Sequence, residues 1–209
     1  VMAPLPDGRL AVALPGGIGI LSKSGPQWAL NSIVPPANGQ GSMATGRILH
    51  ADRQGRLWTD CGRHVCRLDL GDLRKPLEPE AGIDTGTEPV LAIHTDGSGN
   101  LWVGTLKRLW MRAPGAGEFR EVSIPGHPLS IRRVHLGVAP DGHGMVTTRA
   151  GIAVYRDGAW EHIALSDQES DPAPSVTLSD REGNICGLTL EHAKQRADIP
   201  KFSYEYSGA

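Results

Sequence analysis

The sequence predicts an all-β protein, a β-propeller of four-stranded antiparallel blades, because one turn motif recurs along it at steps of 39 to 47 residues. Such fixed-period self-similarity is typical of repeat architectures. The motif is clearest in residues 96–105, Asp-Gly-Ser-Gly-Asn-Leu-Trp-Val-Gly-Thr, and its nearest copy is Asp-Arg-Gln-Gly-Arg-Leu-Trp-Thr at residues 52–59. Shorter copies begin near residues 6, 141 and 180. The anchoring glycines are Gly8, Gly55, Gly99, Gly144 and Gly183.

Each copy lies between two short apolar runs, such as residues 90–93 before and 101–103 after the motif at 96–100. Runs this short, bounded by turn residues, are typical of strands. The aspartate is expected to open the turn by accepting a hydrogen bond from its own backbone, and the glycine to supply a positive φ. The tryptophan then lies on the outgoing strand, where its ring fills the space between neighbouring sheets.

Two further strands complete each predicted unit. A second turn and a third strand follow at residues 105–111 and 61–67, and an aromatic residue such as Trp28 or Phe119 marks the fourth strand. Four strands in 40 to 50 residues are typical of propeller blades. The 27 glycines and 16 prolines among 209 residues exclude a solenoid of helices, because they interrupt nearly every stretch of helical length.

We expect a single domain with blades at about 1–45, 46–89, 90–131, 132–174 and 175–209. The first strand of each blade lines the central channel, so the Asp-x-x-Gly turns lie on one face and the second turns and blade connections on the other. Five repeats fit a closed five-bladed ring or a fragment of a larger ring, for example a seven-bladed one. The last step of 39 residues and the weak fifth repeat favour the fragment.

Composition limits the partners. The chain has 21 Lys and Arg against 23 Asp and Glu, so no strong field favours nucleic acid or an anionic membrane surface. No apolar run approaches the roughly 20 residues of a membrane span. Cys61 and Cys66 flank one hairpin turn as diagonal neighbours, a marginal geometry for a disulfide that leaves a bridge open. Cys186 takes the place of the motif tryptophan and is expected to be a small buried apolar residue.

The phrase Asp-x-x-Gly-Asn-Leu-Trp-Val-Gly-Thr, followed after three residues by Leu109-Trp110, resembles the two-component-regulator propeller repeat. That repeat has the consensus D-x-x-G-N-L-W-I-G-T-x-x-G-L-Y. The match is strong at residues 96–110, good at 52–68 and partial at 141–155, although Arg108 and His64 replace the second-turn glycine.

The resemblance implies a periplasmic or extracytoplasmic sensor domain of a bacterial signalling receptor. Such domains precede a membrane span and a histidine kinase or diguanylate cyclase output, and they bind small molecules, often saccharides. The expected partners are therefore a small-molecule ligand and the rest of a membrane-bound receptor, and a homodimer stays open. The family has no single ligand motif, so the resemblance transfers no site residue.

The acidic and metal-ligating residues favour structure over catalysis. The motif aspartates recur in every blade, as a turn residue does, and no pair of carboxylates departs from the repeat as a glycosidase needs. His50 and His94 share one place in the repeat, but later blades have other residues there, so strand histidines are favoured over a metal ring. Residues 61–66 lack the paired spacing of a zinc site. We expect no cofactor and no metal.

The candidate ligand-binding residues lie on the loop-rich face, opposite the Asp-x-x-Gly turns. They are Arg47, Arg63, His64, Glu88, Lys107, Arg108, Arg132, Arg133 and Arg149. Several cations and one carboxylate around a channel mouth suit an oxygen-rich or acidic ligand. The leading hypothesis is a non-catalytic ligand-sensing module. The alternatives are a propeller enzyme, either a glycosidase or one resembling virginiamycin B lyase, and a protein-interaction platform.

Overall fold

The computed structural model describes residues 1–35, 48–61, 64–126, 128–129, 134–139, 141–149, 151–164, 176–179 and 185–188. These residues form four four-stranded antiparallel sheets and a two-stranded one, with no helix among them. The prediction of an all-β protein with four-stranded blades is confirmed. The expected fifth blade falls largely outside the described residues, which include only its hairpin.

In every sheet the strands follow one another in chain order. Blade 1 contains β1 (Met2–Pro4), β2 (Leu10–Leu14), β3 (Gly17–Ser24) and β4 (Gln27–Val34). Blade 2 contains β5 (Leu49–Ala51), β6 (Arg56–Cys61), β7 (His64–Asp69) and β8 (Glu78–Pro79). Blade 3 contains β9 (Ala92–Thr95), β10 (Leu101–Gly104), β11 (Leu109–Arg112) and β12 (Arg120–Val122). Blade 4 contains β13 (Leu136–Val138), β14 (Gly144–Thr147), β15 (Gly151–Arg156) and β16 (Ala159–Ala164), and β17 (Val176–Ser179) pairs with β18 (Ile185–Leu188).

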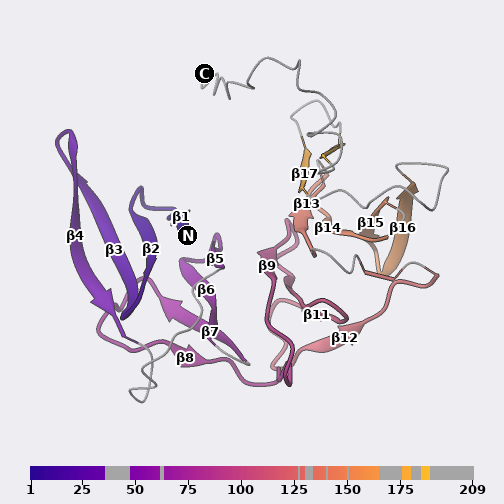
Figure 1. Ribbon diagram of the computed structural model, residues 1–209, viewed down its shortest axis with the longest axis horizontal. Helices are drawn as coiled ribbons and strands as arrows, with labels where there is room; N and C mark the ends of the chain where they lie inside the picture. Colours follow the sequence, from indigo (N-terminus) through magenta and orange to yellow (C-terminus); the bar gives the residue numbers. More distant parts are fainter. Residues whose placement is uncertain are drawn as a thin grey trace.

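The four blades follow an arc (Figure 1), with β1, β5, β9 and β13 toward its inside and β4, β8, β12 and β16 toward its outside. Consecutive inner strands contact one another from β1 through β17. The arrangement is that of a partial β-propeller. Among the described residues, no helix is long and apolar enough to span a membrane.

The tryptophans of the motif occupy the same register in their blades. Trp58 pairs with His50 in blade 2, and Trp102 pairs with His94 in blade 3. Cys186 pairs with Leu178 in the equivalent position of the β17–β18 hairpin. The repeat inferred from the sequence is therefore a repeat in three dimensions.

The frame of the fourth copy is two residues away from the predicted one. The turn of blade 3 is closed by hydrogen bonds from the Asp96 N–H to the Asn100 carbonyl and from the Gly99 N–H to the Asp96 carbonyl. In blade 4 the same pair of bonds involves Ala139, His143 and Gly142. Gly142 has a φ of 90°, like the 82° of Gly99.

The anchoring glycine of blade 4 is therefore Gly142, and the assignment to Gly144 was wrong. Gly144 is the first residue of β14, in the place of Leu101. A Cβ there would lie 2.7 Å from Trp102 Nε1 of blade 3, so the small residue makes room for the indole. Asp141-Gly142-His143-Gly144 offers two glycines that fit the pattern, and the sequence-based choice took the later one.

The motif aspartate does more than open its turn. Asp96 Oδ1 accepts the backbone N–H of Asn100 at 2.9 Å, and its Oδ2 accepts the indole N–H of Trp102 at 2.8 Å. Asp52 binds Trp58 in the same way at 2.9 Å. Both indoles are buried, and a buried N–H without an acceptor is costly.

Aspartate and tryptophan are present together or absent together in the four blades. In the corrected frame, blade 4 has Ala139 and Met145 at these two positions, and blade 1 has Leu5 and Ala11. A blade without the indole does not need the carboxylate. This coupling explains why the first and fourth copies of the motif look weak.

The apolar cores lie between blades, because neighbouring sheets pack face to face. Ala11 and Ile20 of blade 1 pack with Leu57 and Leu68 of blade 2. Two further clusters continue this packing, one between blades 2 and 3 and one between blades 3 and 4, and a smaller cluster lies within blade 4. Blade-to-blade contact of this kind holds the turn ends of the inner strands close together.

A disulfide joins Cys61 at the end of β6 to Cys66 on β7. Cys61 pairs with His64, so Cys66 is the diagonal neighbour that the sequence predicted. The Cα atoms are 5.8 Å apart, within the ordinary range for a disulfide. The expectation of a marginal geometry was wrong, because the twist of a hairpin shortens one of its diagonals.

Candidate functional site

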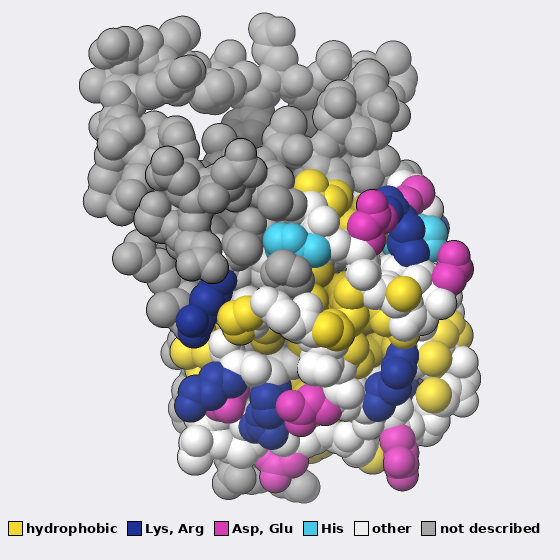
Figure 2. Space-filling view, turned by 90° about the vertical axis from the view of Figure 1, so that its right-hand side faces the viewer, with side chains coloured by type: hydrophobic (Ala, Val, Ile, Leu, Met, Phe, Trp, Pro, Cys, Tyr) yellow, Lys and Arg dark blue, Asp and Glu magenta, His cyan; other side chains and the backbone are white. Residues whose placement is uncertain are grey.

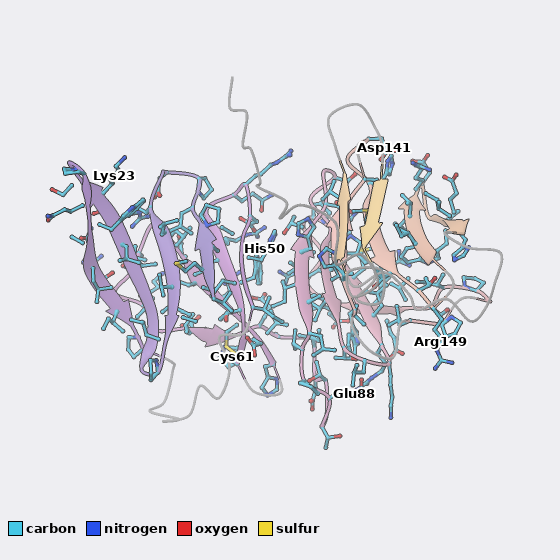
Figure 3. The ribbon with its side chains drawn as sticks, turned by 45° about the horizontal axis from the view of Figure 1, so that its top comes forward. Lys23, His50, Cys61, Glu88, Asp141 and Arg149 are labelled. Atoms are coloured by element: carbon cyan, nitrogen blue, oxygen red, sulfur yellow. A yellow bond between two sulfur atoms is a disulfide. The ribbon has the colours of Figure 1, made fainter. Side chains whose placement is uncertain are left out.

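The predicted ligand-binding residues lie at the expected end of the blades where they are described. Figure 3 shows Cys61, Glu88 and Arg149 on the side of the molecule opposite Asp141. The second turns and the Asp-x-x-Gly turns therefore point to opposite faces. Outside the described residues lie Arg47, Arg63, Arg132 and Arg133.

Glu88 and Arg108 are brought together, and they bind each other and their surroundings. The Arg108 guanidinium lies 3.6 Å from the Glu88 carboxylate, donates to the Thr85 carbonyl at 2.7 Å and stacks over Trp110. Glu88 also accepts the Thr105 hydroxyl at 2.5 Å. The pair therefore ties the connection before β9 to the β10–β11 turn.

The other three described candidates are not part of this cluster. The His64 ring Nδ1 lies 3.4 Å from the Ile83 carbonyl, and the Lys107 and Arg149 side chains are exposed. Within the described part of the chain, no hydrogen bond or ion pair joins these three side chains to the Glu88–Arg108 pair. On the side of the molecule in Figure 2, positive and negative side chains alternate rather than form a patch of one sign.

A better-formed site lies at the other end, between blades 2 and 3. A cavity of about 390 Å³ opens between β5 and β9 at the Asp-x-x-Gly turns, with Val138 of β13 at its inner side. Its lining consists of His50, Ala51, Asp52, Arg53, Gln54, His94, Thr95, Asp96, Gly97, Ser98, Gly99 and Val138. Inner strands that lie side by side place equivalent residues of two repeats in one cavity.

Two histidines and a threonine form the polar centre of this cavity. The His50 and His94 rings lie 4.6 Å apart between centroids. His50 Nε2 accepts the backbone N–H of Thr95 at 2.9 Å and lies 3.0 Å from the Thr95 hydroxyl. An acceptor nitrogen carries no proton, so this bond requires neutral His50 with its proton on Nδ1.

The surroundings keep these imidazoles uncharged at neutral pH. Burial, together with the neighbouring His94, lowers the pKa of His50 to about 4, and the Asp52 carboxylate offsets only part of this. Burial and nearby His135 lower the pKa of His94, and burial lowers that of His135. The cavity therefore offers neutral ring nitrogens rather than cations.

The two cavity aspartates are already engaged. Burial alone raises the pKa of Asp52, but hydrogen bonds from Trp58 and Arg56 outweigh it and lower the pKa below its ordinary value. Asp96 is buried and bound to Asn100 and Trp102. Neither carboxylate is free to act as a general acid or base.

A ligand in the cavity therefore meets neutral hydrogen-bonding groups, the cation of Arg53, and two carboxylates that are already hydrogen-bonded within the protein. His94 and Thr95 are half-buried, whereas Arg53, Gln54 and Ser98 are exposed at the rim. Among the residues that the structure describes, no group of three His, Cys, Asp or Glu side chains is placed to hold a metal ion. The arrangement suits an uncharged ligand rich in hydroxyl groups.

The sequence indicated that His50 and His94 hold equivalent positions, whereas the ligand was expected at the opposite face, and that location stays a prediction. The signal that points to the cavity is the repeat itself. Two histidines at one repeat position on adjacent inner strands must be neighbours in a propeller. The contact between His50 and Thr95 spans 45 residues and has no local motif.

No protein-family model matches the chain, and no curated protein matches it. Several solved structures share its fold at low sequence identity. The extracellular domain of BT4673 from B. thetaiotaomicron, described as a hybrid two-component system, aligns with a TM-score of 0.60 and 14% identity over 88% of this chain. A second structure of that domain, described as a one-component system, gives a TM-score of 0.62 and 15% identity. This chain spans only 25% of either BT4673 chain.

Two other neighbours have different descriptions. YCF48 bound to a D1 peptide aligns with a TM-score of 0.52 and 17% identity, over 81% of this chain and 54% of that one. A protein described as a gluconolactonase aligns with a TM-score of 0.56 and 16% identity, over 88% of this chain and 73% of that one. Likeness at these identities shows the propeller fold, and function is a separate question.

Proposed function

We propose that this chain is part of a ligand-sensing β-propeller in the extracytoplasmic region of a bacterial signalling receptor. It binds a small uncharged polar ligand, of the saccharide or polyol class, in the cavity between β5 and β9. The observation that carries the proposal is the pair of neutral histidines that two blades bring together in one cavity. A ligand there contacts both blades at once and therefore stabilises the folded arrangement of the two blades.

Two observations support the cellular setting. The BT4673 structures are extracellular domains of proteins described as signalling systems. The Cys61–Cys66 disulfide is a bond that persists in oxidising compartments. Both agree with the resemblance of residues 96–110 to the two-component-regulator repeat.

Catalysis is the second candidate, because one neighbour is described as a gluconolactonase. Hydrolysis of a sugar lactone needs a group that activates water. In the cavity the carboxylates are bound to tryptophans, and His50 Nε2 is occupied by the Thr95 N–H. The engaged state of these three groups favours binding without turnover, and lactones are included in the test below because His94 is a neutral imidazole, the type of group that acts as a general base.

The test is a thermal-shift screen of neutral saccharides and polyols, repeated with sugar acids and lactones. A ligand at about 100 times its Kd stabilises the folded state by about 2.7 kcal/mol, which raises Tm by roughly 5–10 °C for a chain of this size. Three variants locate the site. His94→Ala removes a cavity group, His162→Ala removes a half-buried histidine of blade 4, and Arg149→Ala removes a cation of the opposite face.

The proposal expects the shift to disappear in His94→Ala and to persist in the other two. A shift that is lost in Arg149→Ala and kept in His94→Ala moves the site to the loop-rich face. Consumption of a lactone by the wild type, measured by proton release, makes the chain an enzyme. A screen without any hit overturns the choice of ligand class.

A further inference from the structure

Blade 1 has an apolar face that no part of the described chain covers. Strand register places Met2, Val12 and Ile33 in one row of this face, and Leu10 and Leu30 in the next. The exposed fractions are 69% for Met2, 51% for Leu30 and 51% for Ile33. Trp28, 45% exposed, continues the face on β4. We call this surface the open face.

The opposite face of the same sheet is buried. Ala3, Ala11, Ile18 and Ile20 point from it into the core shared with blade 2. A surface sheet normally turns polar residues to water and apolar residues to its core. Blade 1 is apolar on both faces, which is the pattern of a sheet covered on both sides.

In the other blades the equivalent face is covered by the preceding blade. Leu57 occupies in blade 2 the place of Leu10 in blade 1, and it is buried by contact with Ala11 and its neighbours. Leu101 has the same place in blade 3 and packs with Trp58 of blade 2. Blade 4 repeats the contact where Val146 packs against Trp102.

The open face also has the shape of a sheet-packing surface. Gly19 lies between the Leu14 and Leu30 side chains, and a Cβ on it would lie 2.7 Å from one and 3.0 Å from the other. The two leucine side chains therefore lie against the glycine on this face. Contiguous exposed apolar surface of this kind marks a site of contact with another protein segment.

We propose that a further propeller blade of the same polypeptide packs on the open face. It covers Met2, Leu30 and Ile33 as blade 1 covers Leu49 and Leu57 of blade 2. The same contact recurs at all three complete blade junctions of the described chain, and it joins parts of one polypeptide each time. The effective concentration of a tethered blade favours it over a free partner.

The structural neighbours have longer chains than this one. The chain accounts for 73% of the length of the protein described as a gluconolactonase and for 25% of either BT4673 chain. These chains therefore extend beyond the part that this chain matches. The inference does not depend on the ligand proposed above.

Thiol labelling of the natural polypeptide tests the proposal. Leu30→Cys places a thiol on the open face, Lys107→Cys gives an exposed reference, and Val103→Cys gives a buried one, since Val103 is 0% exposed. Each variant is labelled with a polar maleimide, and the rate is compared with that of the parent protein. Circular dichroism confirms that each variant keeps the β spectrum.

The expected result is that Leu30→Cys reacts at least tenfold more slowly than Lys107→Cys, with the protein monomeric by light scattering. A reaction as fast as that of Lys107→Cys shows that the face is open to water and overturns the proposal. Protection that disappears on dilution, together with a dimer by light scattering, assigns the face to a second copy and overturns the intramolecular blade. Protection only when a membrane or another protein is added overturns it as well.

Discussion

The hydrogen bond between Asp96 and Trp102 makes a sharp prediction about stability. The Asp96 side chain is buried and accepts three hydrogen bonds, from the Asn100 N–H, the Asn100 side-chain amide and the Trp102 indole. Asp96→Ala removes all three acceptor contacts and leaves the indole N–H buried without a partner. A buried donor left without a partner costs about 1–3 kcal/mol, and each of the other two hydrogen bonds contributes about 0.5–1.5 kcal/mol, so we expect a loss of about 3–5 kcal/mol in unfolding free energy.

Trp102→Phe keeps an aromatic ring and removes the donor. It loses ring volume as well, so its own cost mixes packing with hydrogen bonding. The double variant has neither group, as blade 4 has neither with Ala139 and Met145. The unfolding free energy lost in the double variant should therefore be about 1.5–3 kcal/mol smaller than the sum of the losses in the two single variants.

Urea unfolding followed by far-UV circular dichroism measures all four proteins of the cycle without relying on tryptophan fluorescence. Asp52→Ala combined with Trp102→Phe is the matched control, because Asp52 binds Trp58 and shares no partner with Trp102. Its coupling should stay within about 0.5 kcal/mol of zero. The predicted hydrogen-bond contribution is refuted by a coupling below about 0.5 kcal/mol between Asp96 and Trp102, or by an equal coupling in the control. Asp96→Asn replaces Asp96→Ala if the latter does not fold.

The pKa of His50 is about 4 in the folded protein against an ordinary value of 6.5, so its contribution to stability is complete above pH 6.5 and falls between pH 6.5 and 4 by at most about 3 kcal/mol. Urea unfolding at pH 7.5, 6 and 5 should show that the unfolding free energy falls less with decreasing pH in His50→Gln than in the parent protein. An equal fall in both proteins contradicts the prediction. Replacing Cys61 and Cys66 with serine should lower stability by about 2 kcal/mol, from the short loop that they close, and a reductant titration of the parent should give the same loss. Gly97→Ala places a Cβ 2.7 Å from a backbone oxygen of blade 4 and should cost about 1–3 kcal/mol, whereas Gly16→Ala, with nothing within 4 Å, should change Tm little; equal effects refute the steric argument.

The repeat was readable from the sequence because its parts are local. Asp96 and Trp102 are six residues apart, so strand, turn and ring position follow from a single stretch. The anchoring glycine of blade 4 was predicted wrongly because residues 141–146 lack the Asp-Trp pair. Gly142 and Gly144 both fit the pattern that remains. The missing pair removed the feature that fixes the frame.

The candidate site was less readable because its contacts join distant residues. Arg108 was identified as a cation at the second turn, but its carbonyl partner on Thr85 lies 23 residues earlier. That bond gives Arg108 a structural contact, and its role in ligand binding stays a prediction. Whether a charged side chain serves a ligand or the fold depends on such contacts, and residue type does not reveal them.

The indole–carboxylate bond also constrains how a repeat of this kind can change during evolution. Loss of the aspartate alone leaves a buried indole N–H without an acceptor, and loss of the tryptophan alone leaves a buried carboxylate without its donor. A protein with only one of the two substitutions is therefore less stable than both the ancestor and the descendant that has both substitutions. Blades should then drift away from the motif in pairs of substitutions and rarely return. The blades of this chain that have kept the bond, the second and the third, are for that reason the ones that still reveal its ancestry.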